Sequence, residues 1–202
     1  FKIKKLIYAA SASCYGIPSK YPTNEKSKID PQNPYAVTKY LGEQLALNWH
    51  KLYKLPTVSL RFFNAYGPGE YYHHYRSVVC LFSYRALAGI PWQVYEGYHR
   101  VFMYIDDFIP TLANAVEKFD PGNVINIGGD EYRSVKDLSD LILEYTGADP
   151  SLVEYLPEDK HNIVNKRPNI DKAINMFGHK STVNLEEGIP KTINWMKKIY
   201  NL

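Results

Sequence analysis

Three side chains in the first fifth of the chain have the types and spacing that acid–base chemistry needs. Tyr35 and Lys39 lie four residues apart, so on a helix both project from one face. A free phenol has a pKa near ~10 and is a poor base at neutral pH, but an ammonium held close to it favours the phenolate. Ser11 could hold a substrate oxygen or share the travelling proton. Together they predict a proton-transfer site, although on an exposed helix the same Tyr–Lys spacing also describes an ordinary solvated pair.

The sequence around these residues predicts the elements that position them. Residues 4–10 form a short apolar run typical of a buried parallel strand, and residues 17–34 hold four prolines without periodicity, which indicates a loop. A helix is expected from Tyr35, and it carries an apolar stripe made of Leu41, Leu45, Trp49 and Leu52. This stripe fits either packing in the core or a contact between two copies of the chain.

The rest of the chain alternates between strand and helix patterns. Strands are predicted at residues 57–63, 92–95 and 124–127. Helices are predicted over residues 76–88, from a cap at Asp106 or Asp107 with Pro110 in the first turn, from a capping box at Ser134 to Gly147, and along 189–196. Residues 150–183 look irregular. The alternation predicts an α/β domain with a largely parallel sheet, whose ligands bind beyond the carboxyl ends of the strands.

Composition narrows the class of protein. The 202 residues are 45% hydrophobic and 22% charged, and the net charge of +3 is spread out, which argues against a nucleic-acid partner. No apolar run reaches the length of a membrane span and no signal peptide is recognisable, so a cytoplasmic protein is expected. Cys14 and Cys80 are predicted to be buried, reduced thiols. His73 and His74 lack a carboxylate or cysteine at ligand spacing, so no metal is expected.

Three blocks in order resemble the extended short-chain dehydrogenase/reductases, the family of nucleotide-sugar epimerases and dehydratases. They are residues 11–16 (Ser-Ala-Ser-Cys-Tyr-Gly), 33–39 (Asn-Pro-Tyr-Ala-Val-Thr-Lys) and 61–69 (Arg-Phe-Phe-Asn-Ala-Tyr-Gly-Pro-Gly). The resemblance covers essentially the whole chain, because residues 100–107 and 126–129 fit as well. It implies the C-terminal part of a Rossmann-like doubly wound parallel sheet with a smaller α/β substrate-binding region. Residues 1–65 would belong to the NAD-binding domain, and residues 66–202 would mainly bind the nucleotide sugar, with segments near 92–130 returning to the main sheet.

The resemblance also implies roles for individual residues. The implied catalytic residues are Ser11, Tyr35 and Lys39. The implied cofactor contacts are Tyr35, Lys39 and Ala10. The implied substrate contacts are Ser13, Asn64 and Arg100, with a second basic contact at Lys166 or Arg167. Arg100 would grip the nucleotide diphosphate with its forked, permanently charged head; a surface salt bridge is the alternative.

The residues that follow Ser11 indicate which reaction the resemblance implies. Dehydratases of the family resemble Thr-Asp-Glu there, and decarboxylases carry a Glu two residues before the Tyr, whereas this chain has Ala12 and Ser13. This favours C4 epimerisation of a nucleotide-diphosphate sugar, with UDP as the favoured nucleotide. Tyr35 would remove the hydroxyl proton, NAD or NADP would take the hydride, and the 4-keto sugar would be reduced again from its opposite face. The alternatives are a 4,6-dehydratase, a 4-keto-sugar reductase or a non-catalytic sugar-nucleotide-binding remnant.

The sequence departs from the family in its cofactor motif. No Gly-x-Gly-x-x-Gly pattern occurs, and Gly128-Gly129 comes too late to replace it. The chain is therefore expected to be N-terminally truncated, inactive alone, and to expose an apolar edge at its first strand. Residues 95–100 and the loop at 71–74 are more aromatic than in common relatives; they would shape the sugar pocket or cover the core. The helix with Tyr35 and Lys39 would take part in a homodimer.

Overall fold

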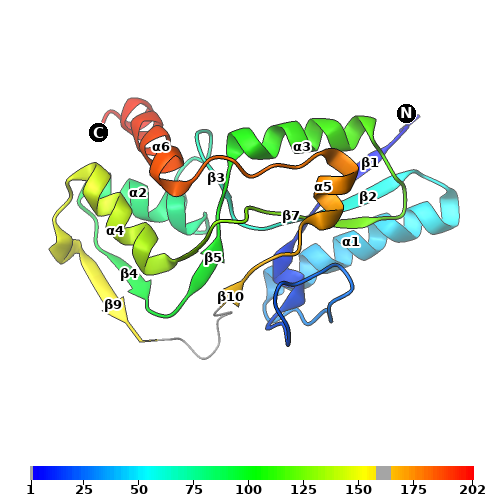
Figure 1. The fold of residues 1–202 in the computed structure, drawn as a ribbon, viewed down its shortest axis with the longest axis horizontal. Helices are drawn as coiled ribbons and strands as arrows, with labels where there is room; N and C mark the ends of the chain where they lie inside the picture. Colours follow the sequence, from blue (N-terminus) through cyan, green and yellow to red (C-terminus); the bar gives the residue numbers. More distant parts are fainter. Residues whose placement is uncertain (1, 158–164) are drawn as a thin grey trace. The chain divides into compact units, whose positions relative to one another are not determined.

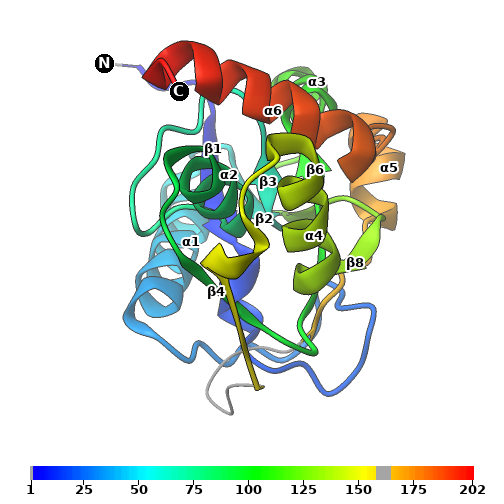
Figure 2. The same ribbon diagram turned by 90° about the vertical axis from the view of Figure 1, so that its left-hand side faces the viewer.

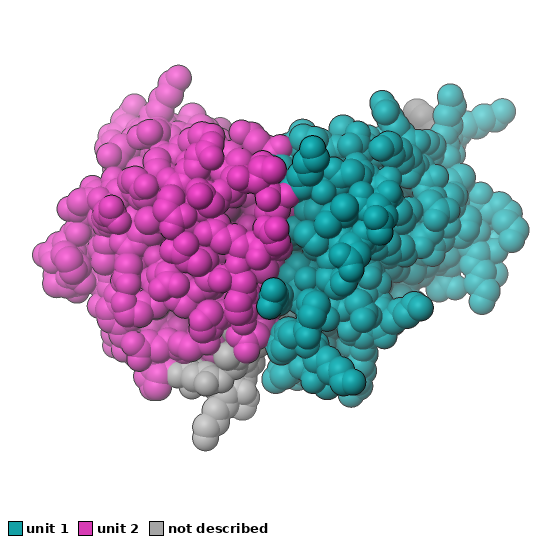
Figure 3. All heavy atoms as spheres, in the orientation of Figure 1, with its two compact units in different colours: residues 1–63, 107–128, 167–180 teal, residues 64–106, 129–166, 181–202 magenta. Residues whose placement is uncertain are grey.

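The computed structural model describes residues 2–157 and 165–202 and divides the chain into two compact units (Figures 1 and 3). Unit 1 contains Phe1–Phe63, Asp107–Gly128 and Arg167–Lys180, and unit 2 contains Asn64–Asp106, Gly129–Lys166 and Ser181–Leu202. The chain therefore passes between the units several times. How the units divide binding and chemistry stays a prediction.

Unit 1 is built on a three-stranded parallel sheet in the order β1-β2-β7. These strands are β1 (Leu6–Ser11), β2 (Thr57–Phe62) and β7 (Val124–Ile127). Buried residues follow one another along β2, as expected for a strand covered on both faces. Ser11 stands opposite Phe62 in the register, so β1 and β2 end at the same edge of the sheet. The predicted parallel sheet is confirmed.

Three helices cover the two faces of this sheet. Helix α1 (Pro34–Tyr53) lies on one face, and α3 (Ile105–Glu117) and α5 (Asp171–Phe177) lie on the other (Figures 1 and 2). Helix α1 begins where Asn33 accepts a hydrogen bond from the backbone N–H of Ala36 at 2.9 Å. It approaches β1 closely at Gly42, where an added Cβ would lie 2.0 Å from the hydroxyl oxygen of Tyr8.

Two details predicted for the helices of unit 1 are wrong. Helix α3 begins at Ile105, so Asp106 and Asp107 lie in its first turn instead of capping it, and Pro110 lies inside the helix beyond that turn. The apolar stripe of α1 does not pack into the core, because all four of its side chains are exposed: Leu41, Leu45, Trp49 and Leu52. Within the residues described, the stripe is therefore not part of the core.

Unit 2 packs three helices around an apolar core. They are α2 (Val78–Ala88), α4 (Val135–Thr146) and α6 (Leu185–Tyr200), which contact one another (Figure 2). Leu138, Ile142 and Ile189 are buried among them with Phe102 and Trp92. Ser134 and Asp137 form the predicted capping box at the start of α4, and Gly147 ends that helix in a left-handed conformation.

The strands of unit 2 are short and pair with partners far away in the sequence. β5 (His99–Val101) lies between β10 (Asn165–Lys166) and β8 (Tyr132–Ser134). The parallel pairs are β4 (Trp92–Tyr95) with β9 (Val153–Leu156), and β3 (Ala65–Tyr66) with β6 (Met103–Tyr104).

Part of the stretch predicted to be irregular is ordered. It contains η2 (Pro150–Leu152), β9, β10 and α5; residues 158–164 lie outside the described residues. These elements have only two to seven residues each, too few for a periodic pattern, and the two strands are stabilised by pairing with distant partners.

The cysteine prediction is confirmed in unit 1 and in unit 2. Cys14 and Cys80 are both free and buried. The pKa of the Cys14 thiol is raised to about 11 and that of the Cys80 thiol to about 12, mainly by burial. Both thiols therefore stay protonated at neutral pH. Within 2–157 and 165–202 no helix is long and apolar enough to cross a bilayer.

Candidate active site

Lys39 links the helix that carries Tyr35 to the strand that carries Ser11. Its Nζ donates a hydrogen bond to the carbonyl oxygen of Ala9 at 3.0 Å, and it lies 5.9 Å from the ring centre of Tyr35. Ala9 is two residues before Ser11 on β1, so the ammonium joins the first turns of α1 to the end of that strand. The same Nζ lies 5.9 Å from the ring centre of Tyr8, which sequence analysis did not single out.

Ser11 is held in place at the carboxyl end of β1. Its side-chain oxygen accepts a hydrogen bond from the backbone N–H of Ser13 at 3.2 Å and so caps η1 (Ala12–Tyr15). A hydroxyl that accepts in this way keeps its own hydrogen to donate, so Ser11 can still bind an oxygen atom. Ala10, a predicted cofactor contact, is buried next to it.

Tyr35 is accessible where it would need to be for chemistry. It lies in the first turn of α1 and is 55% exposed. A large aromatic side chain left this open at the end of a sheet is available to a ligand, and its hydroxyl is not used by the fold in any described hydrogen bond. The site therefore combines an open phenol, an anchored ammonium and an anchored hydroxyl.

Beneath this site lies a buried polar network that sequence analysis missed. Arg61 of β2 makes a two-point ion pair with Glu43 of α1: Nε to Oε2 is 2.8 Å and Nη2 to Oε1 is 2.6 Å. Arg61 Nη1 also donates to the hydroxyl of Tyr15 at 2.7 Å, and that hydroxyl donates to Asn126 of β7 at 2.7 Å. Signals for it existed in the sequence: an arginine inside a β-rich run, and a Glu one turn after Lys39 on the same helix.

Burial and pairing act in opposite directions on the pKa values of this network. Burial alone would lower the pKa of Arg61, but its hydrogen bonds to the Glu43 carboxylate and the negative charge of that carboxylate raise the pKa overall, so Arg61 stays charged. Burial raises the pKa of Tyr15 more than the guanidinium lowers it, so Tyr15 stays a neutral phenol. Arg61 and Tyr15 therefore each keep one charge state at neutral pH.

Arg100 and Lys166 form a cationic pair in unit 2. They are paired residues of β5 and β10, and Arg100 is buried. Burial and then the nearby charge of Arg100 lower the pKa of Lys166 to about 8. Two neighbouring cations in a partly desolvated place fit an anion such as a diphosphate.

The other predicted substrate contacts are distributed between the units. Asn64 of unit 2 has a positive φ of 38°, and its Nδ2 donates to the carbonyl oxygen of Val101 at 3.1 Å. Arg167 belongs to unit 1, where its carbonyl accepts from the N–H of Thr23 at 2.8 Å, while Lys166 belongs to unit 2. Ser13 of unit 1 is half-buried beside Ser11. The structure thus joins Ser11, Ser13 and Lys39 in one unit and Arg100 with Lys166 in the other.

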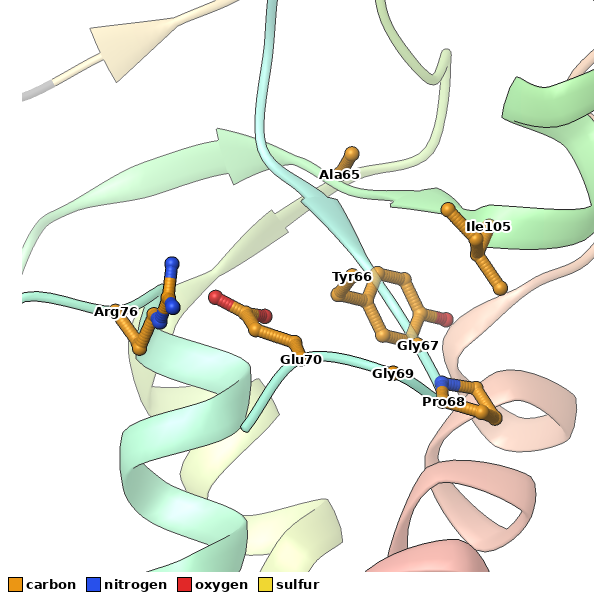
Figure 4. Close-up of a pocket in the computed structure, with 8 residues that line it drawn as sticks. All are labelled: Ala65, Tyr66, Gly67, Pro68, Gly69, Glu70, Arg76 and Ile105. Atoms are coloured by element: carbon orange, nitrogen blue, oxygen red, sulfur yellow. The ribbon is translucent and has the colours of Figure 1, made fainter. Parts of the chain in front are cut away.

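A pocket of about 450 Å³ in unit 2 adds residues that sequence analysis did not assign (Figure 4). It is formed by the turn at Ala65–Gly69, Tyr66 and Ile105, with Glu70 and Arg76 as its charged groups. Glu70 accepts hydrogen bonds from the N–H and hydroxyl of Ser77, the residue that caps α2. The feature of the sequence that could have indicated this pocket is the glycine- and proline-rich turn directly after Asn64. Among the described residues, no cluster of His, Cys, Asp or Glu could hold a metal ion.

The residues present fit one end of a nicotinamide dinucleotide. Tyr35 is open and Lys39 is a fixed donor near it, so a ribose would find hydrogen-bond donors there. Ala10 is buried at the strand end and presents little surface of its own. The pyrophosphate end needs a glycine-rich turn at a helix start, and this sequence contains none.

Comparison with known proteins identifies the class. Residues 1–128 match the sequence profile of the "NAD dependent epimerase/dehydratase family", so the chain belongs to that family. It is similar to UDP-glucuronate 4-epimerase 1 of Arabidopsis thaliana, with 30% identity over 96% of this chain and 49% of that protein. It is equally similar to dTDP-D-glucose 4,6-dehydratase of Mus musculus, with 30% identity over 98% of this chain and 57% of that protein.

Solved structures agree on the fold. The structure of UDP-glucose 4-epimerase from Thermotoga maritima with UDP-glucose superposes with a TM-score of 0.88 and 31% identity, covering 98% of this chain and 64% of that one. The α/β fold predicted from sequence is confirmed by this match. The chain spans less than two thirds of the length of these relatives.

Proposed function

We propose that this chain is the catalytic and substrate-binding part of an NAD-dependent enzyme that inverts C4 of a UDP-linked sugar. The observation that carries the proposal is the position of Lys39, bound to the carbonyl of Ala9 at 3.0 Å and 5.9 Å from the Tyr35 ring. A fixed ammonium next to an open phenol is the arrangement that lets a tyrosine act as a base near neutral pH. Similarity to a UDP-glucuronate 4-epimerase and a UDP-glucose 4-epimerase supports the substrate class.

Each residue has a defined part in this mechanism. Tyr35 takes the proton of the C4 hydroxyl, and Lys39 stabilises the phenolate that does so. Ser11 donates its hydrogen to the same sugar oxygen and keeps it oriented while the 4-keto sugar exists. NAD, when bound, supplies the hydride acceptor and donor. Arg100 and Lys166 hold the diphosphate, so that the reacting ring can turn over without leaving the enzyme.

The absence of extra carboxylates separates this reaction from dehydration. Loss of water from a sugar needs an added acid and base, and Ala12 and Ser13 supply neither. The similarity to a dTDP-D-glucose 4,6-dehydratase keeps that reaction as the second candidate, beside a 4-keto-sugar reductase. The third candidate is a non-catalytic protein that binds sugar nucleotides.

A panel of sugar nucleotides tests these candidates. The enzyme is assayed as the complete protein, meaning this chain joined to a glycine-rich cofactor-binding segment. An epimer as the product supports the proposal, whereas a keto sugar, a reduced deoxy sugar or no turnover contradicts it. Calorimetric titration separates the third candidate, because a simple binder takes up UDP and ignores NAD. The 202-residue polypeptide alone is expected to show no turnover, since it lacks the pyrophosphate contact.

The exposed stripe of α1 supports a further part of the proposal, a homodimer. Leu45 is 61% exposed, and Leu41, Trp49 and Leu52 extend the same apolar surface. Substituting Leu45 and Trp49 with Glu would yield monomers in sedimentation equilibrium; an unchanged oligomeric state would exclude this surface. We also propose a cytoplasmic enzyme that supplies sugars for polysaccharide synthesis.

A further inference from the structure

We infer that the buried network of Glu43, Arg61, Tyr15 and Asn126 is a positioning device for the catalytic residues. The inference rests on the proposed function, because it assigns these residues to the same site. None of the four lies where it would touch substrate: Arg61 and Glu43 have side chains that are 4% and 1% exposed. They act through the elements that carry Ser11, Tyr35 and Lys39.

The network joins α1, which carries Tyr35 and Lys39, to η1, which Ser11 caps. Glu43 lies on α1 one turn after Lys39, and Tyr15 lies four residues after Ser11 at the end of η1. Arg61 holds both: it binds the Glu43 carboxylate at two points and the Tyr15 hydroxyl at a third. The planar guanidinium fixes the direction of each bond, which an apolar contact would not do.

Asn126 anchors the network to the third strand of the sheet. Its Oδ1 accepts from the Tyr15 hydroxyl, its Nδ2 donates to the carbonyl of Thr23, and its N–H donates to Glu25 at 2.9 Å. Through Thr23 and Glu25, Asn126 therefore also holds the loop that leads from η1 to α1. This loop leads directly into α1, whose first turn carries Tyr35.

Stability alone does not explain this choice of residues. Two buried charges cost desolvation energy, and apolar residues of similar volume often stabilise a protein as well or better. What the charged network adds is a single geometry for α1 against β2 and η1. A proton transfer is sensitive to such geometry, since a displacement of about 1 Å can cost about 100-fold in rate.

The test replaces the ion pair by apolar residues in the complete protein. Glu43→Leu/Arg61→Met is expected to fold with a near-normal melting temperature, while kcat falls about 10-fold to 100-fold and KM for the UDP-sugar stays unchanged. Arg61→Lys keeps the charge but loses the fork, and should fall between this variant and the wild type. Lys136→Gln/Asp140→Asn removes an exposed ion pair of α4 and serves as the matched control with unchanged kcat.

The outcomes separate the inference from the function on which it rests. A folded double variant with wild-type kcat would overturn the inference. Should the double variant fail to fold, kcat and KM are measured for Arg61→Lys and Tyr15→Phe instead, and a wild-type kcat in both would overturn the inference. If even the wild type turns over no sugar nucleotide, the proposed function fails. A crystal structure of the double variant then tests the positioning role of the network separately. A Lys39–Ala9 contact kept at 3.0 Å would refute that role, and a lost contact would support it.

Discussion

The two units hold the side chains that we propose to be functional in different ways. In unit 1, Ser11 ends a six-residue strand and Lys39 lies on a 20-residue helix, which also carries one partner of a buried ion pair. In unit 2, Arg100 and Lys166 lie on strands of three and two residues, and its ion pairs around Arg133 are partly exposed. Chemistry at a single atom needs one rigid geometry, whereas holding a diphosphate needs mainly charge. The following experiments test this contrast.

The largest effect is expected at Tyr35. Tyr35→Phe removes the base without removing a core side chain, because the residue is exposed and its hydroxyl holds nothing else in the described structure. We expect kcat of the complete protein to fall about 100-fold to 10,000-fold, with an unchanged melting temperature. Stopped assays with chromatographic product analysis measure it. A variant with more than a tenth of the wild-type kcat would mean that another group is the base.

Much of unit 1 was predictable, and the reason lies in its periodicity. The strand before Ser11, the helix from Tyr35 and the strand at 57–62 are long enough to show burial or helical patterns, and the Tyr–Lys spacing is local. The partner of Arg61 was not predictable, because Glu43 is 18 residues away and only the fold brings them together. In unit 2, β9 and β10 were missed because short strands have no pattern of their own.

The second largest effect compares one ion-paired arginine from each unit. Arg61→Ala leaves Glu43 buried without its partner, so the free energy of unfolding should fall by about 3–5 kcal/mol. Arg133→Ala in unit 2 removes a cation that is 33% exposed and should cost at most about 1 kcal/mol. Urea denaturation followed by circular dichroism measures both. Equal losses would remove the distinction between the units.

The third experiment tests how closely α1 packs on β1. Gly42→Ala would place a methyl group 2.0 Å from the Tyr8 hydroxyl oxygen and should cost about 1–3 kcal/mol of unfolding free energy. Adding Tyr8→Phe removes that oxygen, so the double variant should recover part of the loss. The same urea titration gives the coupling between the two sites. Strictly additive losses would show that the helix and the strand do not touch there.

The smallest effect concerns the cationic pair of unit 2. Because the pKa of Lys166 is lowered to about 8, its positive charge is lost as pH rises above that value. A bound diphosphate favours the charged form, so the affinity for UDP should fall above pH 8 by at most about tenfold per pH unit, with proton uptake on binding. Calorimetry in two buffers measures both. Lys166→Met should flatten the profile and Lys180→Met should leave it unchanged; a flat wild-type profile would refute the role of Lys166.

The sign for stability follows from the same shift. The folded chain releases the Lys166 proton near pH 8 and the unfolded chain only near ~10.4, so between these values the unfolded state binds more protons. The contribution of this lysine therefore makes unfolding harder as pH rises through that window. In Lys166→Met, the free energy of unfolding measured by urea titration should no longer rise with pH through this window. If the rise persisted in this variant, another group would be its cause.

The central claim is that the sugar loses and regains hydrogen at one carbon, with Tyr35 as the base. The most direct measurement uses a UDP-sugar labelled with deuterium at C4 and follows the label by NMR in the complete protein. The account predicts a C4 epimer that keeps its deuterium at C4. Deuterium found at C6 or in the solvent, or a product that is not an epimer, would contradict it.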